Sequence, residues 1–581
     1  MHPTPTPPCD PACDPACDTA CDTAFTAALV RDLDEDVTGL LAPDAPALSP
    51  LAHRETTSRL KALVTAACHP GSVHHGSALV HATASRLVGQ LRAAQTPGGL
   101  FDSTNLASPP DTAFTVNDLC LTAAIAERDP ALADVAAGLR DVAARVLPPL
   151  LTGGVHTPNH RWELASALAR LEALLGPDAA VRARVEEWLA EGVDLQPDGM
   201  YSERSPLYAG AVTNPSLLVL ADLLDRPELL DPVRRNLEAF LPLLDEDGVV
   251  ESVHSRRQDQ HAPGHPGRDL LLPYRRLALE EGRADFADAA RLLQAHGVDG
   301  RRLLPEVLVR PALGAVLPAG PGTAWNGRAE LPASGLLVHA SGRTRTVVFG
   351  GSDQPRVGTI RSGTANSATF LRLRHGAAVL ESVRLSTAFF GLGPFRSATL
   401  GRADDGAVLL HQELRAGYYQ PLAAADRDPA GAYPLGDEGR FHAAMAFDRR
   451  RVDAVELVTD VRVDLLDDGA DLTVGFGGAA TSYALELTFR PGGVLEGVAP
   501  AAGGGSVPTG AQVRYAVGPD EIVLTRTGEG AGAADQPARY DGGEQYDYLR
   551  GSHAAEGERV YLTGRTPGVL RVRLRGRGGA G

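Results

Sequence analysis

The spacing of apolar residues changes near residue 305, and this change constrains the fold more than any other feature of the sequence. Before it, apolar residues recur three and four positions apart, as in Leu164, Leu168 and Leu171. After it, short alternating runs such as 344–349 and 483–489 lie between turns that contain Gly, Asp and Pro. The first spacing is typical of amphipathic helices and the second of half-buried strands. The sequence therefore predicts helices followed by strands, with separate cores.

The helical half predicts an all-α domain of roughly ten to twelve helices arranged as successive antiparallel hairpins. Prolines at first turns (Pro215, Pro227) and glycines after last turns (Gly176, Gly192) mark helix starts and ends. The clearest helical runs are 58–67, 77–95, 131–146, 160–175, 179–192, 215–224, 227–244 and 284–296. The strand half predicts an antiparallel β-sandwich. Its clearest strand runs are 335–339, 344–349, 378–385, 452–465, 470–476, 483–489, 512–515, 521–525 and 569–574.

The first 24 residues contain a four-residue Cys-Asp repeat with Cys9, Cys13, Cys17 and Cys21. Thiolates and carboxylates are metal ligands, but the Cys-x2-Cys pairing of zinc sites is absent and the prolines disfavour a helix. We therefore expect a disordered low-complexity tail and no metal or other cofactor. The expected domains are this tail (1–24), the helical domain (25–305) and the β-sandwich domain (306–581).

The formal net charge of −17 argues against binding to nucleic acid or to an anionic membrane surface, because both need a basic surface. Lys61 is the only lysine among 55 basic residues, which is typical of a GC-rich coding sequence, so abundant arginine is weak evidence for anion binding. No secretory signal pattern or membrane-length apolar run is present, and Cys68 and Cys120 imply no disulfide framework. We therefore expect a cytoplasmic protein.

Three polar clusters interrupt the helical half, and the first is 157–163. Asn159 stands where a helix N-cap is expected, and Glu163 is near enough for a capping interaction. Capping explains Asn159 but not the adjacent His160 and Arg161. The positive end of a helix dipole suits a bound carboxylate, so these residues are candidates for substrate binding or catalysis.

The second cluster runs from the Asp198-Gly199 turn to Tyr208. It is either an ordinary polar connection with packed tyrosines or part of an active site. Glu203 and Arg204 are candidate substrate-binding residues, and a nearby arginine or histidine lowers the pKa of a tyrosine that acts as a base. Tyr208 is the candidate catalytic tyrosine, and Tyr201 is a second candidate for contact with substrate.

The third cluster, 254–261, is either a solvated charged loop or a local basic pocket. The planar guanidinium groups of Arg256 and Arg257 suit bidentate binding of carboxylates, with Gln258 and Asp259 beside them. A weaker polar cluster at 95–99 and 105–114 adds Gln95 as a candidate residue of a sugar cleft. His69, His74, His75 and His81 have no carboxylate at a diagnostic spacing, so they are interpreted as surface histidines.

Together these groups could neutralise a substrate carboxylate and transfer a proton beside it, which favours cleavage of acidic glycans by β-elimination. The Asn159-His160 pair before a helix, the Asp-Gly…Tyr-x-Glu-x-Ser-x-x-Tyr loop about forty residues later and the order of helices and strands resemble the heparinase II/III-like polysaccharide lyases, which include oligoalginate lyases. The resemblance implies an incomplete (α/α) toroid followed by an antiparallel β-sandwich, and an acidic oligosaccharide as substrate. It leaves a homo-oligomer open.

The resemblance also implies roles for residues. Asn159 and His160 would neutralise the uronate carboxylate, and Tyr208 would be the acid and, for syn elimination, also the base. Members of the family usually carry a histidine on an early β-sandwich strand, but the corresponding segment here, 363–370, has none. His375 and His411 lie downstream and do not match the pattern, so the second proton-transfer residue stays unassigned.

Two other functions remain open from the sequence. A glycoside hydrolase on the same kind of toroid would need two facing carboxylates, and Asp111, Asp198, Glu203 and Asp259 are available for this. A non-catalytic carbohydrate-binding protein would keep the fold without the chemistry, because fold alone does not determine function.

Overall fold

The structure, a computed structural model, describes residues 20–42, 53–103, 106–322, 325–527, 539–544, 546 and 556–578. The chain divides into two compact units. The helical unit comprises residues up to 202, 206–250 and 266–324, and the sandwich unit comprises 203–205, 251–265 and the chain from 325 onwards. Residues 1–19 of the expected tail lie outside the described residues, and the first helix begins at Thr23, where the side chain of Asp22 caps it.

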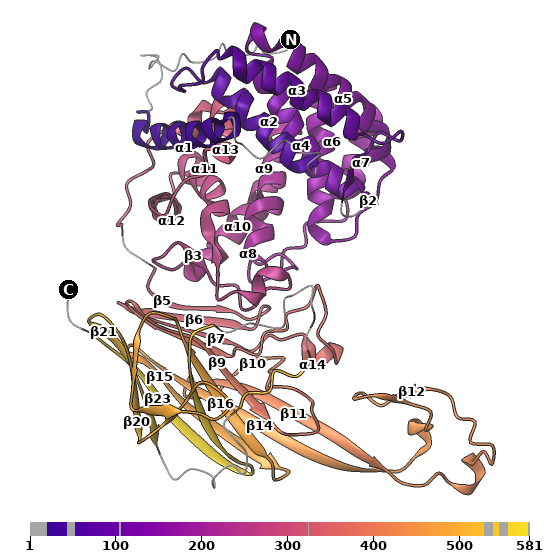
Figure 1. Cartoon of the computed structure of the whole chain (residues 1–581), viewed down its shortest axis with the longest axis vertical. Coiled ribbons are helices and arrows are strands. Elements are labelled where there is room, and N and C mark those ends of the chain that lie inside the picture. Colours follow the sequence, from indigo (N-terminus) through magenta and orange to yellow (C-terminus); the bar gives the residue numbers. More distant parts are fainter. Residues whose placement is uncertain are drawn as a thin grey trace. The chain divides into compact units, whose positions relative to one another are not determined.

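The helical unit confirms the all-α prediction for the first half of the chain (Figure 1). Two-residue strands occur at β1 (Asp102–Ser103), β2 (Leu106–Ala107), β3 (Val249–Val250) and β4 (His265–Pro266). The helices are α1 (Thr23–Leu41), α2 (His53–Cys68), α3 (Ala78–Ala94), α4 (Pro109–Ala126), α5 (Ala133–Thr152), α6 (Pro158–Leu175), α7 (Ala179–Leu189), α8 (Pro206–Tyr208), α9 (Asn214–Leu223), α10 (Leu230–Phe240), α11 (Leu271–Glu281), α12 (Ala284–Ala295) and α13 (Gly300–Val309).

The single helix expected at 227–244 is wrong in its limits. A 3-10 turn, Pro227–Leu229, precedes α10, and a second, Leu241–Leu243, follows it. Pro242 lacks a backbone N–H and its ring clashes with the preceding turn, so the α-helical hydrogen-bond pattern ends before it. The predicted ends at Gly176 and Gly192 are confirmed, since both glycines adopt positive φ after α6 and α7.

The helices form two layers around a central cavity. Helices α2, α4, α6, α9, α11 and α13 line the cavity, and α3, α5, α7, α10 and α12 do not. Successive lining helices pack on one another, as α2 does on α4 and α4 on α6, while α3 packs on α2 and α7 on α6. This arrangement is an (α/α) toroid, as the sequence resemblance implies.

The sandwich unit consists of two large sheets, which confirms the predicted antiparallel β-sandwich. Among the described residues, strand pairing is antiparallel except for one parallel residue pair, Ser506 with Val560. One sheet has nine strands in the order β18 (Val498–Pro500), β19 (Ser506–Pro508), β22 (Glu558–Arg565), β16 (Ser482–Phe489), β9 (Ala378–Thr387), β8 (Leu371–His375), β7 (Thr344–Phe349), β6 (Leu336–Ser341) and β5 (Gly327–Leu331). The other has eight in the order β10 (Leu400–Arg402), β11 (Val408–Tyr419), β14 (Val452–Leu466), β15 (Gly469–Gly478), β23 (Gly568–Gly578), β21 (Asp520–Thr527), β20 (Gln512–Val517) and β17 (Val494–Glu496).

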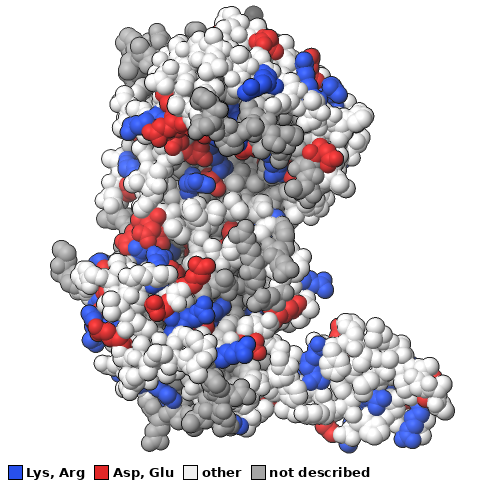
Figure 2. Space-filling model, in the orientation of Figure 1, with Lys and Arg blue, Asp and Glu red and all other residues white. Residues whose placement is uncertain are grey.

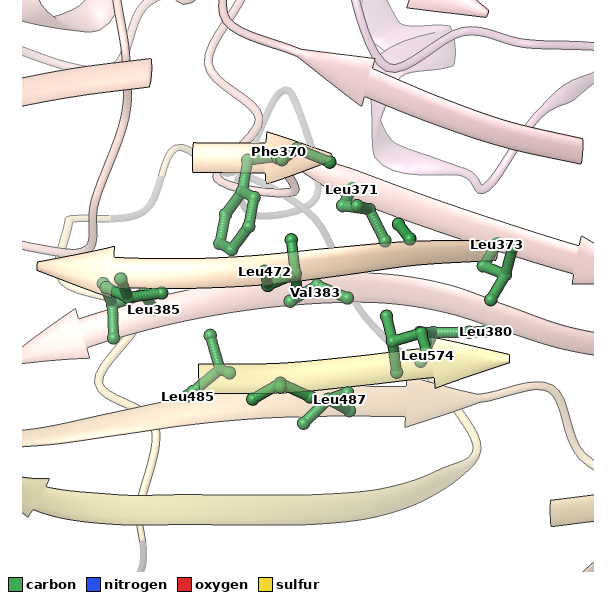
Figure 3. Packing of buried hydrophobic residues seen from close by; sticks show 14 of the residues in the cluster. Phe370, Leu371, Leu373, Leu380, Val383, Leu385, Leu472, Leu485, Leu487 and Leu574 are labelled. Carbon is green, nitrogen blue, oxygen red and sulfur yellow. The ribbon is translucent and has the colours of Figure 1, made fainter. Parts of the chain in front are cut away.

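The core of the sandwich lies between the inner faces of these sheets (Figure 3). Leu380 and Leu385 of β9 face Leu472 of β15 and Leu574 of β23, and all four are at most 1% exposed. The alternation of buried and less buried residues along β15 is the pattern expected of a strand with one face in a core. Burial of this apolar surface is the main stabilising contribution to the unit.

Two further features of the sandwich unit matter below. Residues 420–451, which we call the arm, connect β11 to β14 and contain β12 (Gly436–Asp437) and β13 (His442–Ala443) beyond the ends of those long strands (Figure 1). A short helix, α14 (Gln354–Val357), precedes β8. Among the described residues, no helix combines the length and apolar character that crossing a bilayer requires.

Candidate functional site

The Asn159-His160 pair lies inside the first turn of α6, not before it. Pro158 is the first helical residue and Thr157 is the N-cap, without a side-chain capping hydrogen bond. The expectation that Asn159 caps the helix is therefore wrong. Proline is favoured at the first helical position, because its fixed φ suits the helix and its missing N–H would have no partner there. Asn159 is 1% exposed and His160 is 8% exposed.

The imidazole of His160 is held between two other rings. The ring of Phe114, on α4, meets it edge-on at a centroid distance of 6.0 Å, and the ring of His156 does so at 4.7 Å. Edge-to-face packing of this kind fixes ring orientation. The imidazole is therefore oriented by its neighbours before any ligand binds.

Glu163, one turn after Asn159, is buried and does not cap the helix. Asn117 Nδ2 on α4 donates a hydrogen bond to Glu163 Oε1 (2.8 Å), and Ser216 Oγ on α9 donates to Oε2 (3.1 Å). Burial raises the pKa of this carboxyl to about 7, although both hydrogen bonds favour the charged form. The proposed capping role of Glu163 is wrong. The carboxyl is instead a titratable group inside the toroid.

The cavity within the helical unit has a volume of about 780 Å³. Glu163, Phe114 and Asn117 line it, as do several ion pairs, including Lys61 with Asp118 at 2.6 Å. Ligand sites typically have volumes of roughly 300–1,000 Å³. Sequence reasoning missed this cavity and Glu163. The available signal was the single carboxylate one turn after Asn159 in an otherwise apolar stretch of α6.

The two tyrosines of the second cluster have different environments. Tyr201 is 4% exposed, and its hydroxyl donates to Asn214 Oδ1 at 2.7 Å. Burial, together with the charge of Asp194, raises the pKa of Tyr201 well above its usual range, so this phenol stays protonated. Asn214 donates in turn to Asn236 (3.0 Å), and the three side chains form a buried hydrogen-bonded chain.

Tyr208 is half-buried and ends α8, directly before a five-residue π-helical turn, Ala209–Thr213. This turn packs against α6, the helix that carries Asn159 and His160. Single π-helical turns are frequent at functional sites because they change the direction of a side chain within a helix. The helical unit therefore brings the turn that follows Tyr208 against the helix of the Asn-His pair.

Other predicted residues belong to the sandwich unit. Glu203 and Arg257 form a buried ion pair. The guanidinium of Arg256 makes two hydrogen bonds to the carboxylate of Asp353 (2.7 and 2.9 Å). Arg204 has a positive φ of 51° and donates to the carbonyl oxygens of Ala333 (2.6 Å) and Gly351 (3.2 Å). These contacts join 203–205 and 251–265 to the sandwich unit.

The remaining residues of the third cluster are equally engaged. Asp259 is 5% exposed and accepts hydrogen bonds from the hydroxyls of Ser205 (2.7 Å) and Ser255. The side chain of half-buried Gln258 lies 3.4 Å from the Nε of Arg257. The interpretation of 254–261 as a solvated charged loop is wrong for most of its residues, because they are buried and form hydrogen bonds and ion pairs within the protein.

His254 is the one histidine of this cluster with no exposed surface. Neither ring nitrogen has a hydrogen-bond partner within the described part of the chain. Burial and the positive charges of Arg204 and Arg372 lower its pKa to about 3, so the imidazole is neutral at physiological pH. The segment 363–370, where the family pattern has a histidine, lies in the same unit. Its Asn366 N–H donates to Gln260 Oε1 at 2.8 Å.

Gln95 and Arg161 are engaged elsewhere in the helical unit. The amide nitrogen of Gln95 donates to the carbonyl oxygens of Gly99 (3.0 Å) and Val142 (3.1 Å). Arg161 pairs with Glu191 and Asp194, each at 3.0 Å, and its guanidinium lies over the ring of Trp162. These contacts of Gln95 and Arg161 stabilise the local structure of the helical unit.

Of the histidines predicted at the surface, His75 is exposed, whereas His69, His74 and His81 are half-buried. His74 Nε2 lies 2.9 Å from Thr38 Oγ1, and His75 Nδ1 lies 2.9 Å from the carbonyl oxygen of Ala67. In the sandwich unit, His375 bonds Thr344 (2.9 Å) and His411 bonds Asp460 (2.7 Å).

Comparisons with solved structures place this architecture among the polysaccharide lyases. Heparinase III matches with a TM-score of 0.55 and 12% identity over 99% of this chain and 86% of that one. A mutant of the chondroitin AC lyase of Streptomyces coelicolor A3 matches with a TM-score of 0.52 and 13% identity over 97% and 80%. The chain has the fold of these lyases.

A mutant of the heparan sulfate lyase HepC of Pedobacter heparinus also matches, with a TM-score of 0.51 and 10% identity over 95% of this chain and 83% of that one. No protein-family model matches the sequence, and no curated protein matches it. At these identities the similarity establishes the toroid followed by the sandwich. The chemistry has to be argued from the residues.

Proposed function

We propose that the protein is a polysaccharide or oligosaccharide lyase that cleaves uronate-containing glycans by β-elimination. The observation that carries the proposal is the packing of α6, with Asn159 and His160 in its first turn, against the π-helical turn that follows Tyr208. Heparinase III and chondroitin AC lyase, whose fold the chain shares, are named for acidic glycans. A chondroitin AC lyase of the same fold was solved in complex with chondroitin sulphate (TM-score 0.50).

In the proposed reaction the C5–H bond of the uronate and the C4–O glycosidic bond break, and a C4=C5 double bond forms. The C5 proton is acidic only if the negative charge that develops on its removal spreads into a neutralised carboxylate. The amide of Asn159 and the imidazole of His160 donate hydrogen bonds to that carboxylate. Both are buried, and the rings of Phe114 and His156 orient the imidazole, so little reorganisation is needed to stabilise the charge.

Tyr208 carries the proton. As the base it takes the C5 proton, and as the acid it delivers this proton to the leaving glycosidic oxygen, so no other proton acceptor is consumed. Tyr201 is unsuited to this task, because its raised pKa and its hydrogen bond to Asn214 keep it protonated and fixed. A single proton carrier also accommodates the absence of a histidine from 363–370.

Glu163 supports the same reaction through its protonation state. An ionised carboxylate one turn from Asn159 and His160 would repel a uronate, whereas a protonated carboxyl would not. With a pKa of about 7, Glu163 is protonated over the mildly acidic range. We expect substrate affinity to fall as pH rises through 7, independently of any titration of the substrate.

The test is an ultraviolet assay for the unsaturated uronate product on alginate, heparan, hyaluronan, chondroitin and glucuronan oligomers. Tyr208→Phe and His160→Ala should each lower kcat/KM by about 100-fold or more. Tyr274→Phe is the matched control, since it removes a buried hydroxyl of the same unit that donates to the carbonyl oxygen of Leu237 (2.8 Å). Elimination that survives both site variants would refute the assignment, and reducing ends without unsaturation would indicate hydrolysis instead.

A further inference from the structure

Exposed aromatic rings from the arm, from β11 and from the turn after β9 lie together in the sandwich unit. Phe390, Tyr418 and Phe441 are 40%, 59% and 49% exposed. Phe390 and Tyr418 lie with ring centroids 5.9 Å apart, and the guanidinium carbon of Arg440 lies 5.2 Å from the ring of Phe390 and 5.5 Å from that of Phe441. These four side chains form one continuous surface, which we call the aromatic platform.

The platform is held rigidly. Arg440 bonds Glu438 at 2.6 Å, and its Nη2 donates to the carbonyl oxygen of Gly417 at 3.1 Å. Tyr419 donates to the second oxygen of Glu438 at 2.9 Å, and its ring packs on that of Phe447 at 4.8 Å. Because Arg440 is fixed between two rings, the exposed faces of those rings are fixed as well.

The backbone at Phe390 is strained to present its ring. Its φ is +52°, a left-handed conformation that bulky side chains rarely adopt. Gly391 and Gly393 follow with positive φ, so the turn itself is built from residues that tolerate this geometry. A glycine or asparagine at 390 would fit the backbone better. The chain nevertheless places an exposed aromatic ring on this left-handed backbone, which supports a role for the ring in binding.

Charge separates the arm from the rest of the chain. Residues 420–451 contain five arginines (427, 440, 449, 450, 451) and five acidic residues (426, 428, 437, 438, 448), so their net charge is zero and the whole −17 lies elsewhere. Arg449 is exposed, and the Arg451 side chain is 77% exposed. Gln420, two residues after Tyr418, donates its N–H to Arg451 O at 2.9 Å, so the last residue of this basic run lies near Tyr418. Figure 2 shows the arm as largely uncharged surface with separate basic patches.

We propose that the platform is a non-catalytic binding surface for an acidic glycan strand. Sugar rings stack their apolar C–H faces on Phe390, Tyr418 and Phe441, while Arg449 and Arg451 pair with carboxylate or sulfate groups. The exposed arginines favour an anionic occupant over a second copy of the arm, which has a net charge of zero and offers them no net attraction. The identity of the glycan rests on the proposed function, and the surface would tether the polymer that the helical unit cleaves.

The test measures binding and turnover separately. Affinity electrophoresis and calorimetry with a long acidic polysaccharide are carried out in a Tyr208→Phe background, so that the ligand is not cleaved. Tyr418→Ala with Phe441→Ala should weaken binding about tenfold, as expected from losing two stacking contacts. Leu435→Ala is the matched control: it removes a still more exposed apolar side chain (71%) from the arm and should leave binding unchanged.

A second experiment measures turnover of a tetrasaccharide and of the long polymer in protein that keeps Tyr208. The double variant should raise KM for the long polymer and leave kcat/KM for the tetrasaccharide within twofold. Arg449→Ala with Arg451→Ala should reduce the salt dependence of polymer binding, because fewer charge pairs form. If no glycan is cleaved at all, the proposed function fails, and the binding measurement still decides the platform.

Three results would overturn the inference. Polymer binding that is unchanged in Tyr418→Ala with Phe441→Ala would exclude the platform. Equal binding of a neutral polymer such as dextran would exclude acidic-glycan recognition. A dimer in analytical ultracentrifugation that the double variant dissociates would assign the surface to contact between copies of the chain.

Discussion

The side-chain amide of Asn117 donates a hydrogen bond of 2.8 Å to the carboxyl of Glu163, inside the toroid and one turn below the Asn-His pair. Four helices of the inner layer contribute to this neighbourhood: α4 carries Asn117 and Phe114, α6 carries Glu163, α9 carries Ser216, and α2 lines the same cavity. The contact links the packing of the toroid to the protonation state of a group at the candidate site.

The raised pKa of Glu163 predicts that the free energy of unfolding of the helical unit falls as pH rises. Its pKa is about 7 in the folded protein against a reference value of 4.5, so folding binds a proton between these values. The stabilisation is fully present below pH 4.5 and is lost as pH rises through 7, a change of about 3 kcal/mol. The thermal midpoint of the helical unit should therefore fall between pH 5 and pH 8 in the natural protein and fall less in Glu163→Gln. Glu186→Gln, an exposed control, should follow the natural curve.

The lowered pKa of His254 predicts the opposite pH dependence for the sandwich unit, whose free energy of unfolding should rise with pH. Its pKa is about 3 when folded and near 6.5 when unfolded, so its contribution is present above pH 6.5 and is lost as pH falls towards 3. Nitrogen-15 NMR should find the His254 imidazole still neutral at pH 5, well below the ordinary histidine pKa of 6.5. A His254 imidazole that is protonated at pH 5 would contradict the burial described above.

Tyr201→Phe should destabilise the helical unit. The substitution removes the hydroxyl that donates to Asn214 and leaves a buried acceptor without this donor, at a cost of about 1–3 kcal/mol. Chemical denaturation should report a lower midpoint with an unchanged slope. Tyr433→Phe, in the arm, changes a part-buried hydroxyl and should shift the midpoint by much less.

Arg257→Ala should destabilise strongly, because it leaves the buried carboxylate of Glu203 without its main ion-pair partner. Breaking one partner of a buried pair typically costs about 3–5 kcal/mol, whereas replacing both partners by apolar residues is often nearly neutral. Arg257→Leu with Glu203→Leu should therefore be more stable than Arg257→Ala. If the double variant is the less stable of the two, Glu203 and Arg257 make important interactions besides their ion pair. A direct role in substrate binding would then gain support.

The fold was largely predictable from the sequence, because each half has a sustained periodicity. The run Leu164, Leu168, Leu171 can only bury its apolar side as a helix, and the alternation in 344–349 only as a strand. The arm was not predicted, since 420–451 has neither the helical nor the strand periodicity.

The candidate site was predictable in composition but not in arrangement. Asn159, His160 and Tyr208 are recognisable by residue type and spacing. The burial of Glu163 depends on Asn117 and Ser216, which are 46 and 53 positions away in sequence, so no local pattern contains it. The same holds for the ion pair of Glu203 with Arg257, which are 54 positions apart.

Residues 203–205 and 251–265 belong to the sandwich unit although helices surround them in sequence. During synthesis these segments leave the ribosome long before β5 to β9, which supply their partners, such as Asp353 for Arg256 and the carbonyl of Ala333 for Arg204. The polar groups of these segments therefore stay hydrated until the residues that pair with them have been synthesised. The segments 203–205 and 251–265 are therefore expected to reach their final conformation only after translation has passed residue 353. A fragment that ends near residue 305 would lack their partners and would be poorly suited to crystallisation or activity assays.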